Sequence, residues 1–148
     1  MTRGMPGWQG SLANGLTTWP IPDRIFTRWP TERRCVNPND IYLARFPFGG
    51  SAVMKLRPVL LLTCPVGSVP EILVAYISSV MPSPLLPSDL VLDPANADHA
   101  STNLKTRSVV RLHKLATIHS RNVVRHLGSL APTTASDVED RLRKLLSL

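Results

Sequence analysis

Short apolar runs, separated by turns rich in proline and glycine, follow one another along the chain after residue 39. Residues 59–62 and 72–77 are continuous apolar runs, which are typical of strands covered on both sides. Residues 41–46 combine strand propensity with apolar positions on both faces and carry one charge, Arg45. We therefore expect strands over residues 41–46, 59–63 and 72–77, with a turn at residues 47–51.

A proline-rich connection spans residues 81–103 and contains one short apolar segment, residues 90–92, which predicts a strand. Further strands are expected at residues 108–112 and 116–118. A short helical piece is expected over residues 121–127, because Gly128 suits the position that follows a helix.

The last residues predict an amphipathic helix. Ser136 and Glu139 fit a capping box, in which Ser136 is the N-cap and Glu139 is three residues further on. Residues 138, 142, 145 and 146 place apolar side chains on one face, while acidic residues begin the helix and Arg143 and Lys144 lie near its end. Five or six short strands and one helix predict a mainly β fold with a C-terminal helix, built on a small, strongly bent antiparallel sheet or barrel.

Residues 1–38 follow no helical or strand period, and the composition changes near residue 38. This segment holds four glycines, five prolines and the three tryptophans of the chain, Trp8, Trp19 and Trp29. We expect an irregular, poorly ordered N-terminal extension, followed by one domain over residues 39–148. Because tryptophan is frequent in interfaces, a partner-binding role for the extension stands beside the alternative of a leader without function.

The composition is that of a globular protein with a basic surface. Of the 148 residues, 43% are hydrophobic and 18% are charged, which excludes a wholly disordered chain. The net charge is +7, and thirteen of the seventeen cations are arginine, the side chain suited to bidentate phosphate contacts. This charge favours a polyanionic partner, with nucleic acid first, over the alternative of a basic but inert surface.

The sequence gives little support for a metal site, a disulfide framework or a membrane-spanning segment. Two cysteines, Cys35 and Cys64, are too few for a disulfide framework or a four-cysteine zinc site, and the four histidines lack H-E-x-x-H spacing. No apolar run is long enough to span a bilayer, and the first residues lack the apolar core of a signal peptide. We expect a cytoplasmic protein without a cofactor or a membrane partner.

Candidate chemistry is confined to strand ends. Arg57 begins a buried strand after a polar, glycine-containing loop, and Ser78 with Ser79 ends another. Residues at strand ends project into the mouths of small barrels, where ligands commonly bind. Arg57 and Ser78 are therefore candidates to face a common site; a solvated arginine and a turn hydroxyl are the plain alternatives.

Five segments of residues 39–148 carry motifs in a fixed order. Residues 39–48 read N-D-I-Y-L-A-R-F-P-F, and residues 55–62 read K-L-R-P-V-L-L-L. Residues 75–79 read A-Y-I-S-S, residues 108–118 read S-V-V-R-L-H-K-L-A-T-I, and residues 126–130 read H-L-G-S-L. This series resembles the PemK/MazF family of toxin endoribonucleases, whose pattern includes G-D-I-x-x-x-x-F-P-F, K-x-R-P and S-V-[VA]-R-x-D-K.

The resemblance implies an SH3-like β-barrel with a C-terminal helix, which forms a homodimer and cleaves single-stranded RNA, including mRNA, at short sequence motifs without a metal. The 2′-hydroxyl is the nucleophile in such enzymes, so the protein supplies only proton transfer and charge stabilisation at the phosphate. The resemblance also implies inhibition by a cognate acidic antitoxin, and binding to operator DNA through the antitoxin complex.

The family's residue roles carry over to named positions. Arg57 is implied to be the principal catalytic residue, which holds the scissile phosphate, and Ser78 is implied to donate a hydrogen bond to the same phosphate. Four further candidates are implied to contact the RNA: Phe48, Ser51, Lys55 and Ser79.

The chain departs from the family pattern at several positions. The loop beside Ser51 carries no carboxylate to act as a base, and His113 stands where the family often has aspartate. We expect His113 either to be a plain surface substitution or to transfer a proton, since histidine titrates near neutrality. Two other functions stay open: a CcdB-like topoisomerase poison of the same fold, and a catalytically silent DNA- or RNA-binding module.

Overall fold

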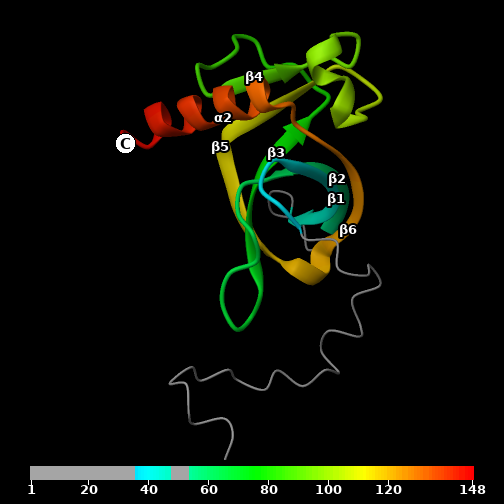
Figure 1. The fold of residues 1–148 in the computed structure, drawn as a ribbon, viewed down its shortest axis with the longest axis vertical. Helices are drawn as coiled ribbons and strands as arrows, with labels where there is room; N and C mark the ends of the chain where they lie inside the picture. The colour runs from blue at the N-terminus through cyan, green and yellow to red at the C-terminus, as the bar shows by residue number, and fades with distance from the viewer. Residues whose placement is uncertain (1–35, 48–53) are drawn as a thin grey trace, which may run out of the picture. The chain divides into compact units, whose positions relative to one another are not determined.

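A computed structural model describes residues 36–47 and 54–148, which form six strands, two 3₁₀ helices and one α-helix (Figure 1). In chain order the elements are β1 (Asp40–Pro47), β2 (Met54–Leu61), β3 (Glu71–Ser78), β4 (Asp89–Leu92), η1 (Ala97–Thr102), β5 (Ser108–His119), η2 (Ser120–Asn122), β6 (Val123–Ser129) and α2 (Pro132–Leu145). Most of the predicted N-terminal extension, and the predicted turn from residue 48 onward, lie outside the described residues.

The strands form one antiparallel sheet in the order β4-β5-β3-β2-β1-β6. This arrangement confirms the predicted mainly β fold with a C-terminal helix. The hydrogen-bonded sheet itself is open, because β4 and β6 are its two edges and do not pair with each other.

Both faces of the central strands are buried, as the continuous apolar runs predict. One face, which we call the α2 face, packs its side chains against Val138 of α2; its central members are Ile41, Leu60, Ala75, Ile77 and Val110. The opposite face buries alternate residues of the same strands, namely Ala44, Val59, Val74 and Val109. Each of these nine strand side chains is at most 1% exposed. The burial pattern explains why residues 59–61 show no polar alternation.

The gap between the two edge strands is bridged by η1 and the residues that follow it (Figure 1). The Asn103 side-chain amide donates to the carbonyl of Leu127, and the Ser101 hydroxyl donates to the carbonyl of Ser129, both at 2.8 Å. Gly128 lies between these contacts, where an added Cβ would meet the carbonyl of Ser101 and would lie 2.7 Å from that of Thr102. Side-chain hydrogen bonds therefore take the place of a strand pairing.

The expected helical piece over residues 121–127 is wrong. Only Ser120–Asn122 form a 3₁₀ turn, and the residues that follow form β6, which pairs with β1. Gly128 is needed for the close approach of η1, not for a helix C-terminus. Two adjacent β-branched residues, Val123 and Val124, favour the strand.

The two strands expected at residues 108–112 and 116–118 are one continuous strand, β5. A register shift in its pairing with β3 separates Tyr76↔Arg111 from Ala75↔Leu115. The intervening residues bulge out of the ladder, which is why polar side chains such as His113 and Lys114 interrupt the apolar pattern there.

The C-terminal helix exists, but it begins earlier than predicted. α2 starts at Pro132 after Ala131, which makes no side-chain capping bond, so Ser136 is inside the helix and the predicted capping box is wrong. Proline suits the first helical position because its missing N–H has no partner there. The predicted apolar face is buried only in part: Val138 is 2% exposed, whereas Leu146 is 54% exposed.

The acidic residues of α2 lie in its middle instead of its first turn, and they form i,i+4 ion pairs. Asp137 accepts from Arg141 at 2.9 Å and Glu139 accepts from Arg143 at 2.6 Å. The hydrogen bond and the charge of Glu139 raise the pKa of Arg143. Within the described residues, no helix is long and apolar enough to cross a membrane.

Candidate active site

Ser78 ends β3, whereas Arg57, predicted to begin its strand, lies within β2, which starts three residues earlier at Met54. β2 and β3 pair in the register Val59↔Tyr76, Leu60↔Ala75 and Leu61↔Val74. The pairing ends at Val59↔Tyr76, and Arg57 and Ser78 each lie two residues beyond this last pair. Since directly opposed residues share a face, and so do residues two apart in a strand, both side chains belong to the same face of the sheet.

Exposure changes sharply at this end of β2. Residues 54–57 are exposed, Pro58 is half-buried, and residues 59–61 are buried. On its other side Arg57 pairs with Ala44 of β1, whose side chain is fully buried. Arg57 is therefore an exposed cation held within the β1–β2 ladder, next to the buried part of β2.

The Ser78 hydroxyl already has one partner. Ser78 is the last residue of β3, is half-buried, and accepts a hydrogen bond from the backbone N–H of Val80 at 3.1 Å. A hydroxyl that accepts from a backbone N–H keeps its own hydrogen for donation. Ser78 is thus held as a donor, while Ser79 beside it is exposed.

Two aromatic rings meet over β2 near these residues. The ring centroids of Phe46 and Tyr76 are 5.7 Å apart at an interplanar angle of 32°. Phe46 pairs with Lys55 and Tyr76 with Val59, so the rings share the face that carries Arg57. Phe46 is half-buried.

His113 belongs to a charged cluster centred on a buried carboxylate. The side chain of Asp89 is fully buried, and its Oδ1 lies 3.2 Å from Arg111 Nε and 3.7 Å from His113 Nδ1. The Ser88 hydroxyl lies 3.5 Å from the same histidine nitrogen, and Asp89 Oδ2 accepts from the N–H of Leu86 at 3.0 Å. The His113 imidazole is 29% exposed and lies beside this carboxylate at the surface.

The sheet brings this cluster to the same face as Ser78. Arg111 is paired with Asp89 on β4 and with Tyr76 on β3, two residues from Ser78. Residues two apart in a strand point to the same face. The cluster and the Arg57–Ser78 pair therefore lie on one continuous side of the sheet.

Asp89 and Arg111 are residues of this region that sequence reasoning missed. A signal existed for Arg111, because a cation within the apolar run of residues 108–112 needs a partner when the strand is buried. The partner was not identifiable, since the β4–β5 pairing joins residues far apart in the sequence.

The remaining predicted contacts divide between described and undescribed residues. Lys55 is exposed on β2, opposite Phe46. Phe48 and Ser51 lie outside the described residues. Within the described part of the chain, no three His, Cys, Asp or Glu side chains are grouped so that they could hold a metal ion.

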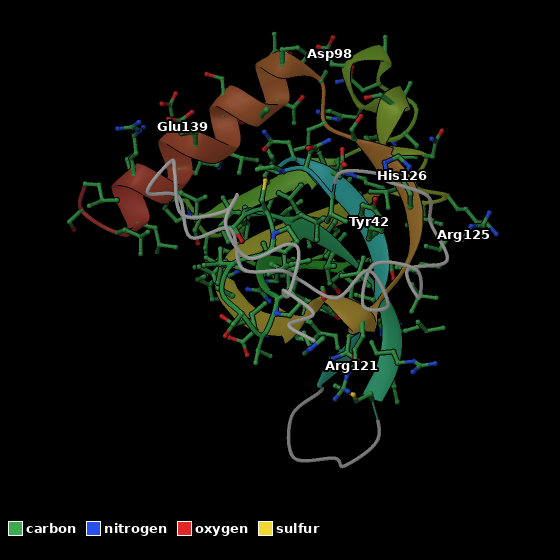
Figure 2. The ribbon with its side chains drawn as sticks, turned by 60° about the horizontal axis from the view of Figure 1, so that its bottom comes forward. Tyr42, Asp98, Arg121, Arg125, His126 and Glu139 are labelled. Carbon is green, nitrogen blue, oxygen red and sulfur yellow. The ribbon has the colours of Figure 1, made fainter. Side chains whose placement is uncertain are left out.

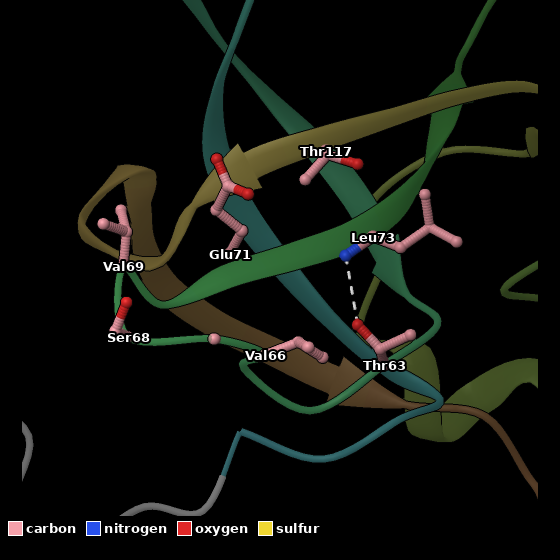
Figure 3. Close-up of a pocket in the computed structure, with 8 residues that line it drawn as sticks. Thr63, Val66, Ser68, Val69, Glu71, Leu73 and Thr117 are labelled. Carbon is pink, nitrogen blue, oxygen red and sulfur yellow. Dashed lines mark hydrogen bonds between the residues drawn. The ribbon is translucent and has the colours of Figure 1, made fainter.

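A pocket lies at the other end of β3, where the β2–β3 connection turns back (Figure 3). Its lining includes Val66, Val69 and Glu71, and the N–H of Leu73 donates to Thr63 Oγ1 at 3.1 Å. Glu71 and Ser78 are the two ends of one extended strand, roughly 23 Å apart. This pocket contains none of the predicted site residues.

Comparisons with known proteins agree with this fold. The family described as PemK-like, MazF-like toxin of type II toxin-antitoxin system matches residues 37–146. No curated protein sequence matches the chain.

Several solved structures are similar. "Mycobacterium tuberculosis toxin MazF-mt6" is 23% identical with a TM-score of 0.57, and the match covers 74% of this chain and 97% of that chain. An endoribonuclease in complex with its cognate antitoxin, from Mycobacterial species, is 14% identical with a TM-score of 0.57, over 76% and 95% of the two chains. MazF from Deinococcus radiodurans is 17% identical with a TM-score of 0.56, over 77% and 98%.

Proposed function

Because the chain belongs to the PemK-like, MazF-like toxin family of type II toxin–antitoxin systems, we propose that it is an endoribonuclease that cleaves single-stranded RNA with Arg57 and Ser78 at the scissile phosphate. The observation that supports this most is the β2–β3 register: a cation two residues before Val59 and a hydroxyl donor two residues after Tyr76 follow the last pair, Val59↔Tyr76, on the same face. A phosphate needs a positive charge and hydrogen-bond donors.

The proposed reaction is an internal transesterification. The 2′-oxygen attacks the adjacent phosphorus as its proton leaves, the bond from phosphorus to the 5′-oxygen breaks, and that oxygen takes up a proton. The products are a 2′,3′-cyclic phosphate and a 5′-hydroxyl end. Negative charge on the non-bridging oxygens increases towards the transition state, so preorganised cations and donors lower the barrier.

Each residue has a role that fits its chemistry. An arginine guanidinium stays protonated, so Arg57 stabilises charge on the phosphate oxygens and is a poor proton acceptor. Ser78 donates its hydroxyl hydrogen to the same phosphate. His113, which lies beside Asp89, is the candidate for proton transfer, because the loop beside Ser51 has no carboxylate.

Four further residues are proposed to border the RNA, namely Lys55, Ser79, Phe48 and Ser51. Lys55 and Ser79 are exposed neighbours of the central pair and can contact backbone phosphates without reading sequence. Phe48 supplies a ring on which an unpaired base can stack. The choice of cleavage sequence falls to these peripheral contacts.

A homodimer and an acidic antitoxin are the proposed protein partners, with operator DNA bound through the antitoxin complex. Support for the dimer comes from exposed apolar side chains on the loop before β4 and on α2. Leu86 of the loop is 41% exposed, and Leu145 of α2 is 40% exposed. Arg141 of α2 joins them, since it donates to the carbonyl of Pro87 at 2.8 Å. Support for the antitoxin comes from the net charge of +7.

RNA cleavage by purified protein in EDTA tests the proposal. We expect wild type to cleave a single-stranded RNA, and Arg57→Ala to lower the rate constant by roughly 10²–10³-fold, as for loss of a transition-state donor. Arg121→Ala, an exposed arginine on η2 (Figure 2), is the matched control and should cleave at the wild-type rate. Intact RNA with fresh wild-type protein, or full activity of Arg57→Ala, would refute the proposal.

A further inference from the structure

Arg111 is a cation on the same face as Ser78, and the proposed reaction gives it no role. Its place on β5 sets it opposite Tyr76, while Val109, two residues earlier, is opposite Ser78. Arg111 and Ser78 are therefore diagonal neighbours across the β3–β5 pair, with Cα atoms about 7–8 Å apart. Because residues two apart in a strand point to the same face, the guanidinium belongs to the side of the sheet that carries the proposed active site.

A buried carboxylate holds the Arg111 guanidinium at one end. Asp89 Oδ1 accepts a hydrogen bond from Arg111 Nε at 3.2 Å, and the Asp89 side chain is fully buried. The turn before β4 holds this carboxylate in turn: Asp89 Oδ2 accepts from the N–H of Leu86 at 3.0 Å, and the N–H of Asp89 donates to the Leu86 carbonyl at 2.9 Å. Since the guanidinium is planar and rigid, the bond at Nε restricts the direction of its remaining donors.

The other end of the same guanidinium is unused. Within the described residues, neither Nη group of Arg111 donates a hydrogen bond. Neither group is among the buried side-chain atoms that lack a partner, and the side chain is 19% exposed, so the Nη groups reach solvent. A fork of N–H donors in fixed geometry matches the oxygens of a phosphate group.

We propose that Arg111 binds, through its Nη groups, the RNA phosphate next to the scissile one. The inference rests on the proposed function for the identity of the ligand. Arg57 and Arg111 belong to β2 and β5, which lie on either side of β3, so two strand spacings of roughly 9–10 Å separate them. A single phosphate group is narrower than this separation. The scissile phosphate therefore stays with Arg57 and Ser78, and the neighbouring phosphate falls to Arg111.

The alternative role for Arg111 is to join β4 to β5 through Asp89 and nothing more. That role uses Nε alone and gives no reason for the Nη groups to reach solvent. Exchange of a largely buried ion pair for apolar side chains is often neutral for stability, so an ion pair is not needed to hold two strands together. A second ligand for the same guanidinium explains why a charged pair stands at this position.

Salt-dependent binding of a nucleic acid tests the contact. The probe is a short, fluorescein-labelled single strand with 2′-deoxyribose, which lacks the attacking hydroxyl, and its Kd is measured by anisotropy at several salt concentrations. Arg111→Met/Asp89→Leu removes the pair without changing the net charge. We expect this double variant to bind about tenfold more weakly than wild type, because a charge-assisted contact is lost. The slope of log Kd against log salt should fall by about 0.7, the share of one phosphate contact in a single strand.

The matched control removes another ion pair of the same charge. Arg143→Met/Glu139→Leu lies on exposed positions of α2 and should keep the wild-type Kd and slope. All measurements are made at about pH 8, where histidine side chains carry no charge, so that loss of Asp89 does not act through His113. Circular dichroism checks folding, and Arg111→Gln/Asp89→Asn, a pair of uncharged amides, replaces the apolar pair if that variant does not fold.

An uncharged methylphosphonate locates the contact. Once the cleavage site of wild type is mapped, this group is placed at each neighbouring phosphate in turn; at one of them it should weaken binding to wild type and leave binding to the Arg111 variant unchanged. No binding by wild type, a wild-type Kd and slope for the folded double variant, or an altered base preference at an unchanged slope would each overturn the proposal. If wild type binds the probe but leaves RNA intact, the nuclease function fails, while the salt slope still decides the role of Arg111.

Discussion

Replacing Asp89 with asparagine tests the charged cluster between β4 and β5. Its two carboxylate oxygens have different partners: Oδ1 accepts from Arg111 and Oδ2 accepts from the N–H of Leu86. An asparagine of the same shape has one acceptor oxygen and one NH₂ group. In either orientation, the NH₂ group faces one of the two donors, and that donor loses its partner.

The expected cost follows from the burial of the site. The Asp89 side chain is fully buried and that of Arg111 is 19% exposed. A buried donor left without an acceptor costs about 1–3 kcal/mol. Loss of the negative charge beside Arg111 adds about 1 kcal/mol, discounted for the partial exposure of the guanidinium. We expect Asp89→Asn to lower the free energy of unfolding by about 2–4 kcal/mol.

Urea denaturation followed by circular dichroism measures this change, at one protein concentration because an oligomer's stability depends on it. The matched control is Asp137→Asn, which removes the ion pair with Arg141 where the aspartate is 44% exposed; we expect a loss below about 1 kcal/mol. If Asp89→Asn costs no more than Asp137→Asn, the cluster does not join β4 to β5 in the way described.

Two further substitutions test particular backbone positions. Gly128→Ala should lower the melting temperature by several degrees, because the new methyl group meets the carbonyls of Ser101 and Thr102 and overpacking costs about 1–3 kcal/mol; an unchanged melting temperature would refute the close approach of η1 to β6. Ser136→Ala should raise the free energy of unfolding by about 0.5 kcal/mol, since the residue is inside α2, where alanine is the better helix former. A decrease of about 1 kcal/mol would instead indicate that Ser136 is the N-cap.

The buried strands were predictable because each is a run of consecutive apolar residues in the sequence. Residues 59–61 and 72–77 are apolar at consecutive positions, and the sheet covers both of their faces. Arg57 and Ser78 were singled out as polar residues at the ends of these runs, and the register of β2 with β3 puts them on the same face, two residues beyond the last pair, Val59↔Tyr76. Their proposed role in RNA cleavage stays a prediction.

The errors have non-local causes. β6 was mistaken for a helix because its pairing with β1 and the contact of Gly128 with η1 both involve residues distant in the sequence. The bulge in β5 divided one strand into two apparent ones. At α2, two local start signals compete, and the proline at position 132 precedes the capping box by one helical turn. Asp89 and Arg111 escaped notice because neither predicts the other without the sheet.

The position of β6 at one edge of the sheet, where it pairs with β1, affects when the sheet can form during synthesis. β1 precedes all the other strands of the sheet, yet its outer edge pairs with β6, which is synthesised after the other five strands. Until then the outer edge of β1 is unpaired, and the chain segment between β1 and β6 is the longest that any strand pairing of the sheet must close. A nascent or prematurely terminated chain can therefore contain Arg57 before its sheet is complete. The order of synthesis therefore delays completion of the sheet until β6 has been made.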